Sequence, residues 1–527
     1  MILYSLWAIL AFTLFVYGLR PAQRWRYRHI PGPSPSWLLG NLVEIVRMGK
    51  HEAFREWGKI YGGIYKIMEG GIVSIVVSDP QLGRWVTARM PNRHNIPSME
   101  TGEDAKFNAA AILFARGVHH RGLRAAWQPM FHSGTLTVFH GMMVAAADTL
   151  CNHLEEAAEV ACPVDVWRRL GDFTMQVSGT TAFGVDIPAQ DAAADDGASS
   201  ALVKSAKDFF DAAGQIEGIY ALLQVTFPSM APAVRQLASV LPTPTYAAGR
   251  RGRHAVQAKV SKLLEDHRKD ASLQQKINTN NNIHHEKGTG VAPGSFLDLM
   301  ARSVNKETGK PFSDMEVICQ SFSFVLAAYE TTTASMAFAL HLLATHPDKE
   351  AKLLAEIDAF GRDIVPTFAQ VTDGKTFPYT EAVFKEALRL LPPVPLAIRE
   401  ADKDLQLGKH TVPAGTHIAV CIYGMHRDPA NWHEPESFIP ERFLMAPGET
   451  SSSKERTDNM DAYMPFGDGP RGCIGQKYAR QEAMVVLIRL YQKYTFKLMD
   501  DMKPLDVRMS LSLTPRYGVN VIVKRRR

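Results

Sequence analysis

Cysteine is scarce in this chain, and no two cysteines stand at C-x-x-C spacing. The 527 residues contain five cysteines, at positions 151, 162, 319, 421 and 473. An odd number of cysteines cannot all pair, so the sequence shows no disulfide framework. We therefore expect a reducing compartment in which the thiols stay free unless they serve chemistry.

Strong charge of either sign is also missing. The formal net charge is +5, which is too small to predict nucleic acid as the ligand. Charged residues make up 21% and hydrophobic residues 46% of the chain, the balance of a globular protein rather than a disordered one. No internal repeat or composition shift divides the main body. We expect residues 37–527 to form one large domain that is mainly α-helical with a small β-sheet component.

Charge is absent altogether from residues 1–19, MILYSLWAILAFTLFVYGL. As a helix with ~1.5 Å rise per residue, this run spans roughly 27 Å, about the hydrocarbon thickness of the endoplasmic reticulum membrane. Four arginines follow it closely: Arg20, Arg24, Arg26 and Arg28. Basic residues on this side place the rest of the chain in the cytosol. The sequence predicts a single-pass anchor over residues 1–19 and a basic, proline-rich hinge over residues 20–36.

A cleaved signal peptide is the alternative interpretation of the same run. No basic segment precedes the apolar residues, and no A-x-A-like cleavage site follows them, so the anchor is favoured. The unpaired cysteines downstream also suit a chain that is not secreted.

Local patterns predict a hairpin and a long core helix. The runs IYKIM and IVSIVV flank Glu69-Gly70-Gly71, which is typical of a β-hairpin. A helix is expected from about Asp314 to Thr345, because Ser313 and Glu316 form a capping box and the helix should stop before the proline that follows. Two polar stretches, residues 188–200 and 273–290, are predicted as surface loops.

The predicted long helix is apolar almost all round, so it should pass through the core. Residues Glu330-Thr331-Thr332-Thr333 interrupt it midway with a carboxylate and three hydroxyls. Buried polar groups of this kind need partners or water, and threonine hydroxyls can bond the carbonyl one turn back and loosen the helix.

The glycine-rich stretch FGDGPRGCIG, residues 466–475, allows two interpretations. It contains G-x-G-x-x-G, the dinucleotide-binding pattern, but no buried strand precedes it and the position twenty residues beyond Gly467 is Leu487 rather than an acid. The other interpretation is a metal held by Cys473, in a loop whose glycines let the backbone approach a flat ligand. Cys473 directly precedes a helical pattern, where free N–H groups favour a thiolate. Taken alone, a lone cysteine is more often a buried structural residue.

The cysteine loop resembles a known family signature at every specified position. Its pattern, Phe466-x-x-Gly469-x-Arg471-x-Cys473-x-Gly475, is similar to the haem-binding signature of the cytochrome P450 family. Three further family motifs occur in the expected order along the chain. They are AAYETT at residues 327–332, the E-x-x-R motif at Glu386 and Arg389, and PERF at residues 440–443.

The resemblance implies a haem b whose iron is ligated by Cys473, with Phe466 packed beside the sulfur. A thiolate ligand favours cleavage of the O–O bond over reversible binding of oxygen. By the same resemblance, Glu330 and Thr331 lie over the opposite face of the haem and relay protons. Two alanines beside them, Ala327 and Ala328, leave room for oxygen and substrate.

The remaining matched residues are expected to hold the fold and the haem carboxylates. Glu386 and Arg389 lie on one helix face, and with Arg442 they would form a structural triad. Arg399, Arg124 and Arg471 are candidates for the haem propionates. His120 stands where the family usually has tryptophan, so its hydrogen bond to a propionate would depend on pH.

The resemblance, together with the predicted anchor, implies a membrane-anchored haem-thiolate monooxygenase that acts on a lipophilic substrate. NADPH would supply electrons through a separate cytochrome P450 reductase, with cytochrome b5 as a further candidate donor, and Lys477 and Arg480 would mark the docking surface. A haem-thiolate isomerase or dehydratase that acts on a peroxide, and a non-enzymatic haem-binding protein, are the alternatives. The sequence does not choose among sterols, terpenoids, fatty acids and xenobiotics.

Overall fold

The computed structural model describes most of the chain. The described residues are Trp7, 20–93, 102–190, 204–205, 218–279, 291–444, 458–499, 502, 504–509 and 512–526. The predicted anchor over residues 1–19 therefore lies outside the described residues, apart from Trp7. No helix within the described part of the chain is long and apolar enough to cross a bilayer.

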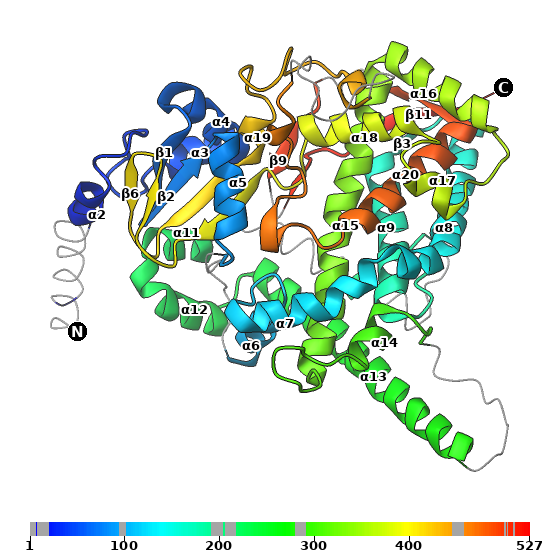
Figure 1. The fold of residues 1–527 in the computed structure, drawn as a ribbon, viewed down its shortest axis with the longest axis horizontal. Coiled ribbons are helices and arrows are strands. Elements are labelled where there is room, and N and C mark those ends of the chain that lie inside the picture. The colour runs from blue at the N-terminus through cyan, green and yellow to red at the C-terminus, as the bar shows by residue number, and fades with distance from the viewer. Residues whose placement is uncertain are drawn as a thin grey trace.

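A four-stranded sheet lies at one end of the molecule (Figure 1). Its strand order is β1 (Ile64–Glu69), β2 (Ile72–Val77), β7 (His417–Cys421) and β4 (Leu396–Glu400). Strands β1 and β2 pair antiparallel with Ile64 opposite Val77, which confirms the predicted hairpin. Strand β2 pairs with β7 in parallel, and β7 pairs with β4 antiparallel.

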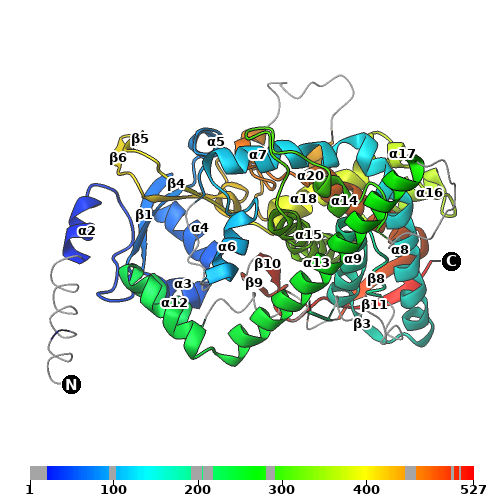
Figure 2. The same cartoon turned by 90° about the horizontal axis from the view of Figure 1, so that it is seen from below.

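The predicted core helix is α15, Asp314–Thr345, and both of its bounds are confirmed. The Ser313 side chain accepts from the Glu316 N–H, and the Glu316 carboxylate accepts from the Ser313 N–H, so the capping box is present. Helix α15 runs through the body alongside α9, Val166–Phe183 (Figures 1 and 2). The polar interruption does not break it, because the helix is continuous through residues 330–333.

The other helices surround α15 and the sheet. Their bounds are α2 Arg20–Arg26, α3 Leu42–Met48, α4 Lys50–Tyr61, α5 Pro80–Arg89, α6 Gly102–Ala110, α7 Gly117–Trp127, α8 Ser133–Val160, α11 Ile219–Thr226, α12 Ala231–Val240, α13 Pro244–Thr279, α14 Phe296–Ala301, α16 Pro347–Phe360, α17 Phe368–Thr372, α18 Pro378–Leu390, α19 Ile422–Met425 and α20 Gln476–Lys493. Short 3-10 helices occur at Gln128–Phe131, Pro228–Met230, Pro440–Phe443, Met460–Ala462 and Gly469–Arg471.

The remaining strands form three small sheets. Strand β11 (Asn520–Arg525) lies between β3 (Pro163–Asp165) and β8 (Tyr494–Leu498), β9 (Val507–Met509) pairs with β10 (Leu513–Pro515), and β5 (Leu405–Leu407) pairs with β6 (His410–Val412). The chain is thus mainly α-helical with small sheets, which confirms the predicted fold class. One loop prediction is wrong in part, because α13 extends to Thr279. The residues LQQKI in that stretch have good helix propensity. The loop was predicted from the polar composition of the whole stretch, which does not distinguish a surface loop from an exposed helix.

Candidate functional site

The cysteine loop is a tight turn between Met464 and the first residue of α20. Gly467 and Gly469 have φ of +67° and +70°, a conformation that favours glycine. A Cβ on Gly469 would lie 2.4 Å from the Thr87 carbonyl oxygen, so a larger residue would not fit against α5. The Cys473 N–H donates to the Phe466 carbonyl at 2.8 Å, which closes the turn and presents the thiol.

The Cys473 side chain has accessible surface, unlike the buried cysteines 151, 319 and 421. The surrounding protein still raises the pKa of its thiol through burial, while the Gly475 N–H and the cations Arg124 and Arg93 act in the opposite direction. A hydrogen bond from the loop and two nearby positive charges are what a sulfur anion needs. At Cys421, burial is complete and raises the thiol pKa to about 12.

An accessible face interrupts the buried surface of α15. Five residues near the midpoint of the helix have accessible surface, and their spacing of three or four places them on one side: Ser323, Leu326, Ala327, Glu330 and Thr331. Tyr329 is also half-buried, but it lies apart from this face and its ring packs against Gly171. A helix that crosses a core exposes a polar stripe of this kind where a ligand lies beside it.

This accessible face lies close to the cysteine loop. Phe324, three residues before Ala327, and Tyr478, five residues after Cys473, have ring centroids 5.2 Å apart. Helices α15 and α20 therefore cross next to both features. Thr331 donates from Oγ1 to the Ala327 carbonyl at 2.6 Å, the back-bond that its position in the helix predicts.

Several cations gather near the loop, among them Arg93, Arg124, Arg399 and Arg471. Burial and mutual repulsion lower the pKa of Arg399 to about 10 and the pKa of Arg471 to about 9. Burial and nearby arginines lower the pKa of His120 to about 3, so its imidazole is neutral at physiological pH. Arg93 belongs to the same group, and no sequence motif marks it. The buried Nε atoms of Arg93 and Arg399 have no acceptor within the described residues, so this cluster is suited to an anionic ligand.

The predicted triad residues are brought together in the core. Arg389 donates from Nε and one terminal nitrogen to the two Glu386 carboxylate oxygens at 2.7 and 2.8 Å, and both side chains have 0% exposure. Arg442 donates to Glu386 at 3.2 Å and also contacts Asp458 at 3.1 Å. The Ile439 N–H donates to Glu386 at 2.9 Å, so no carboxylate charge is left unpaired.

A second contact connects this triad to the cysteine loop. Arg389 donates to the His426 carbonyl at 2.7 Å, and the His426 ring accepts from the Met464 N–H at 2.9 Å. Burial lowers the pKa of His426 to about 3, which keeps the ring neutral and able to accept. The start of the cysteine loop is thus held by the buried ion pair through one histidine.

The chain is similar to known proteins over nearly its whole length. The family model for cytochrome P450 matches residues 30–522 of the chain. The chain belongs to the cytochrome P450 family. It is 30% identical over 506 residues to human cytochrome P450 3A5, and the aligned region covers 93% of this chain and 90% of the relative. It is also 29% identical over 542 residues to pig thromboxane-A synthase, and this aligned region covers 99% of the chain and 96% of the relative.

The residues of this cytochrome P450 fit a haem. Family membership implies a haem-iron cofactor, and the accessible Cys473 thiol would ligate its iron. The arginine cluster offers donors for two carboxylates, since the orphaned Nε atoms of Arg93 and Arg399 need acceptors. The accessible face of α15 offers the opposite side of a flat group. His120, predicted to contact a propionate, lies within the same cluster.

Two of the predicted propionate ligands already have backbone partners in this structure. Arg471 donates to the carbonyl oxygens of Pro91, Ile112 and Ala115 at 2.5, 3.2 and 2.5 Å. Arg124 donates to the Gly472 carbonyl at 2.7 Å. Arg471 therefore joins the cysteine loop to Pro91, Ile112 and Ala115, while Arg93 and Arg399 keep donors for an anion. The contacts of these four arginines with haem propionates remain predictions.

Gln320 holds residues 110–112 from the other side. This fully buried side chain on α15 donates to the Ala110 carbonyl at 2.6 Å and accepts from the Ile112 N–H at 2.9 Å. Because Arg471 binds the carbonyl of the same Ile112, the segment is fixed between the core helix and the cysteine loop. No local sequence pattern marks Gln320, because its two partners lie more than 200 residues away along the chain.

Replacing Gln320 with leucine should loosen this segment and leave two partly buried backbone groups, the Ala110 carbonyl and the Ile112 N–H, without their partner. We expect the free energy of unfolding to fall by roughly 1–3 kcal/mol. The relative affinities of a series of phenyl-substituted imidazoles, measured by their Soret shifts, should change order. Gln481→Leu is the matched control. It also removes a buried side-chain amide, whose hydrogen bond to the Leu136 carbonyl lies away from α15. An unchanged affinity order in Gln320→Leu would show that the segment is held by other contacts.

Proposed function

We propose that this cytochrome P450 is a monooxygenase. It inserts one oxygen atom from O2 into a lipophilic substrate and reduces the other to water, with electrons from NADPH through a separate reductase. The observation that carries the proposal is the carboxyl–hydroxyl pair Glu330 and Thr331 on the accessible face of an otherwise buried helix. A protein that only carried haem would have no use for a proton donor at this position.

The chain's own residues prepare the site for this reaction. Haem, when bound, supplies the oxygen-activating redox chemistry. Cys473 provides a sulfur whose negative charge is favoured by the Gly475 N–H and by Arg124 and Arg93. Coordination to a metal ion deprotonates a thiol outright, which overcomes the effect of burial on the Cys473 pKa. Arg93 and Arg399, whose buried Nε atoms have no acceptor within the described residues, would hold carboxylate groups of the cofactor.

The Glu330–Thr331 pair moves protons to the reacting oxygen. The Thr331 hydroxyl donates to the Ala327 carbonyl, so its oxygen is free to accept a proton from a neighbouring acid or water. Glu330 is the adjacent acid on the same accessible face. Rotation of the Thr331 hydroxyl away from Ala327 would then pass the proton on, which makes this back-bond part of the relay.

Thr331→Ala should uncouple electron consumption from product formation. Loss of an acid–base group typically costs roughly 10²–10⁴-fold, and we expect a decrease near the lower end because water can replace a hydroxyl. The measurement is product formed per NADPH consumed. Thr333→Ala is the matched control, because Thr333 makes the same back-bond, to the Tyr329 carbonyl, but is buried. Equal losses in the two variants would contradict the relay and indicate a structural effect on α15.

We infer that the redox partner docks on the side of the protein that carries α20. Lys477 is exposed there, whereas Arg480 is paired with Glu381. Lys477 is therefore the better-placed cation for an acidic reductase or cytochrome b5. The endoplasmic reticulum membrane is the proposed location, with residues 1–19 as the anchor.

The test of the proposed function uses the purified full chain with a cytochrome P450 reductase. Lipid and terpenoid libraries are first screened for a low-spin to high-spin Soret shift. A compound that gives the shift is then incubated with NADPH and isotopically labelled O2. We expect one labelled oxygen atom in the product. Conversion of an organic peroxide without NADPH or reductase would instead favour an isomerase, a possibility raised by relatives named thromboxane-A synthase.

A further inference from the structure

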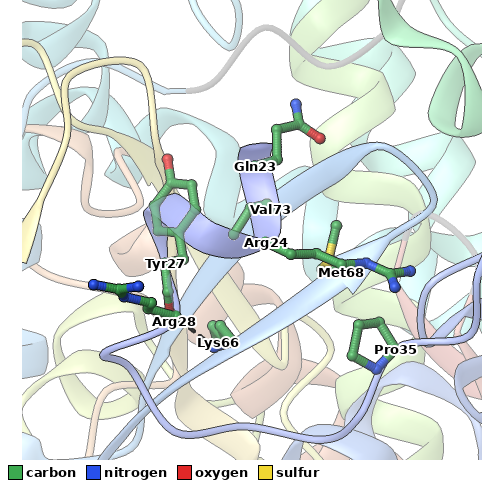
Figure 3. A pocket seen from close by; sticks show the side chains of 8 residues that line it. All are labelled: Gln23, Arg24, Tyr27, Arg28, Pro35, Lys66, Met68 and Val73. Atoms are coloured by element: carbon green, nitrogen blue, oxygen red, sulfur yellow. Dashed lines mark hydrogen bonds between the residues drawn. The ribbon is translucent and has the colours of Figure 1, made fainter. Parts of the chain in front are cut away.

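A hollow of about 210 Å³ lies between α2 and the first strand of the sheet (Figure 3). We call it the hinge pocket, because α2 and the segment after it form the predicted hinge. The hinge pocket is lined by Gln23, Arg24, Tyr27, Arg28, Pro35, Lys66, Met68 and Val73.

We propose that the hinge pocket binds the phosphate headgroup of an anionic phospholipid in the membrane that holds the anchor. Three of its lining residues are cations and none is an acid. In Figure 3 the side chains of Arg24 and Arg28 extend to opposite sides of the pocket, with Lys66, Val73 and Met68 between them. A cationic rim around an apolar floor matches a lipid, whose phosphate is charged and whose glycerol and acyl carbons are not.

The cations of the hinge pocket are built into the fold to different degrees. Lys66 donates from Nζ to the carbonyl oxygens of Tyr27 and Ile30 at 2.8 and 2.7 Å, so it holds the rim in place. Arg24 donates to the Ser36 carbonyl at 2.7 Å, and its buried Nε has no hydrogen-bond partner within the described residues. Arg28 is exposed and lies 4.4 Å from the Trp25 ring centroid. Arg24 and Arg28 thus retain donors for a ligand.

The surface around the hinge pocket has the composition of a membrane interface. Trp25 and Trp37, beside the pocket, are 64% and 51% exposed, and tryptophan is enriched at the headgroup level of membranes. Further exposed apolar side chains lie on α3, α11, α12 and the residues next to them, at the same end of the molecule as α2 (Figures 1 and 2). They include Val43, Val46, Met48, Leu222, Leu237 and Val240.

Contacts along the chain place this apolar surface next to the pocket. The Gly71 N–H, in the turn between β1 and β2, donates to the Val225 carbonyl of α11 at 2.9 Å. Met68 and Val73, on either side of that turn, line the hinge pocket. Helix α2 begins at Arg20, immediately after the uncharged residues 1–19. A seven-residue helix is only ~10 Å long, so Arg24 would lie within the headgroup layer if the anchor spans the membrane.

The test measures lipid selectivity of the full-length holoprotein reconstituted in phosphatidylcholine vesicles. Spin-labelled phosphatidic acid and spin-labelled phosphatidylcholine are compared by the motion-restricted fraction of their spectra. We expect the wild type to prefer phosphatidic acid, and Arg24→Gln and Arg28→Gln each to lower the preference by about fivefold. Arg24→Lys should retain most of it. The carbon monoxide spectrum of each variant reports whether the haem site is intact.

Arg26→Gln is the matched control, because Arg26 is an exposed arginine of α2 that does not line the pocket. An equal decrease in Arg26→Gln, or a wild type without preference, would overturn the proposal in favour of general surface electrostatics. Excess inorganic phosphate at constant ionic strength should leave most of the preference, because Met68 and Val73 add apolar contacts that only a lipid makes. Complete removal of the preference would show that phosphate alone is recognised and would overturn the proposal. The inference rests on the proposed anchoring, and extraction of the wild type from vesicles by alkaline carbonate would disprove anchoring separately.

Discussion

Glu386→Gln should prevent the protein from accumulating in a folded, haem-loaded form. The carboxylate of Glu386 accepts from Arg389, Arg442 and the Ile439 N–H, and the side chains of Glu386 and Arg389 are fully buried. Removing one partner of a buried ion pair leaves an uncompensated charge, which costs roughly 3–5 kcal/mol. That loss is a large fraction of the stability of most proteins. The measurement is haem content per purified chain together with thermal unfolding.

Glu381→Gln provides a graded comparison on the same helix, α18. Glu381 is paired with Lys385 and Arg480, but those partners are 38% and 28% exposed, so solvent screens their charges once the carboxylate is gone. We expect Glu381→Gln to retain haem. Normal haem content in Glu386→Gln would contradict the structural role assigned to the triad.

Cys473→Ser should abolish turnover with NADPH, reductase and O2. The serine hydroxyl is far less acidic than a thiol and would donate less electron density to iron. The electron donation that favours O–O cleavage would therefore be lost. The loop itself should persist, because its closure depends on the N–H of residue 473 and on the glycine conformations at Gly467 and Gly469. Product formation with a substrate identified by its spin shift is the measurement.

Cys162→Ser is the control for the chemical change. Cys162 is exposed just beyond the end of α8 and has no part in the site. It should retain wild-type turnover. Turnover in Cys473→Ser at the wild-type rate would mean that another residue ligates the cofactor.

Features with local signals were predictable from the sequence. The capping box at Ser313 and Glu316 and the proline after the helix mark α15 within the chain itself. The hairpin at residues 64–77 follows from β-branched runs around two glycines. The cysteine loop was recognisable because its glycines, Arg471 and Cys473 occur at the signature spacing within ten residues. Helical spacing placed Glu386 and Arg389 on one helix face, but the buried position of the pair and its contact with Arg442 were expected only from the family resemblance.

Features built from distant segments were not predictable. Arg93 joins the cation cluster only because the chain folds it next to Arg124 and Arg399. The three carbonyl partners of Arg471 lie more than 350 residues away along the chain. Gln320 likewise binds residues 110 and 112 from α15. A lone arginine or glutamine in a sequence carries no sign of which backbone groups it will meet.

The most direct test of the assigned site is the carbon monoxide spectrum of the reduced full-length protein. Wild-type protein and Cys162→Ser should both show the red-shifted Soret band of a thiolate-ligated haem. Cys473→Ser should lose that band while still containing haem, because the arginine cluster and the buried triad are unchanged. A thiolate-type band that persists in Cys473→Ser would contradict the assignment of Cys473 as the ligand.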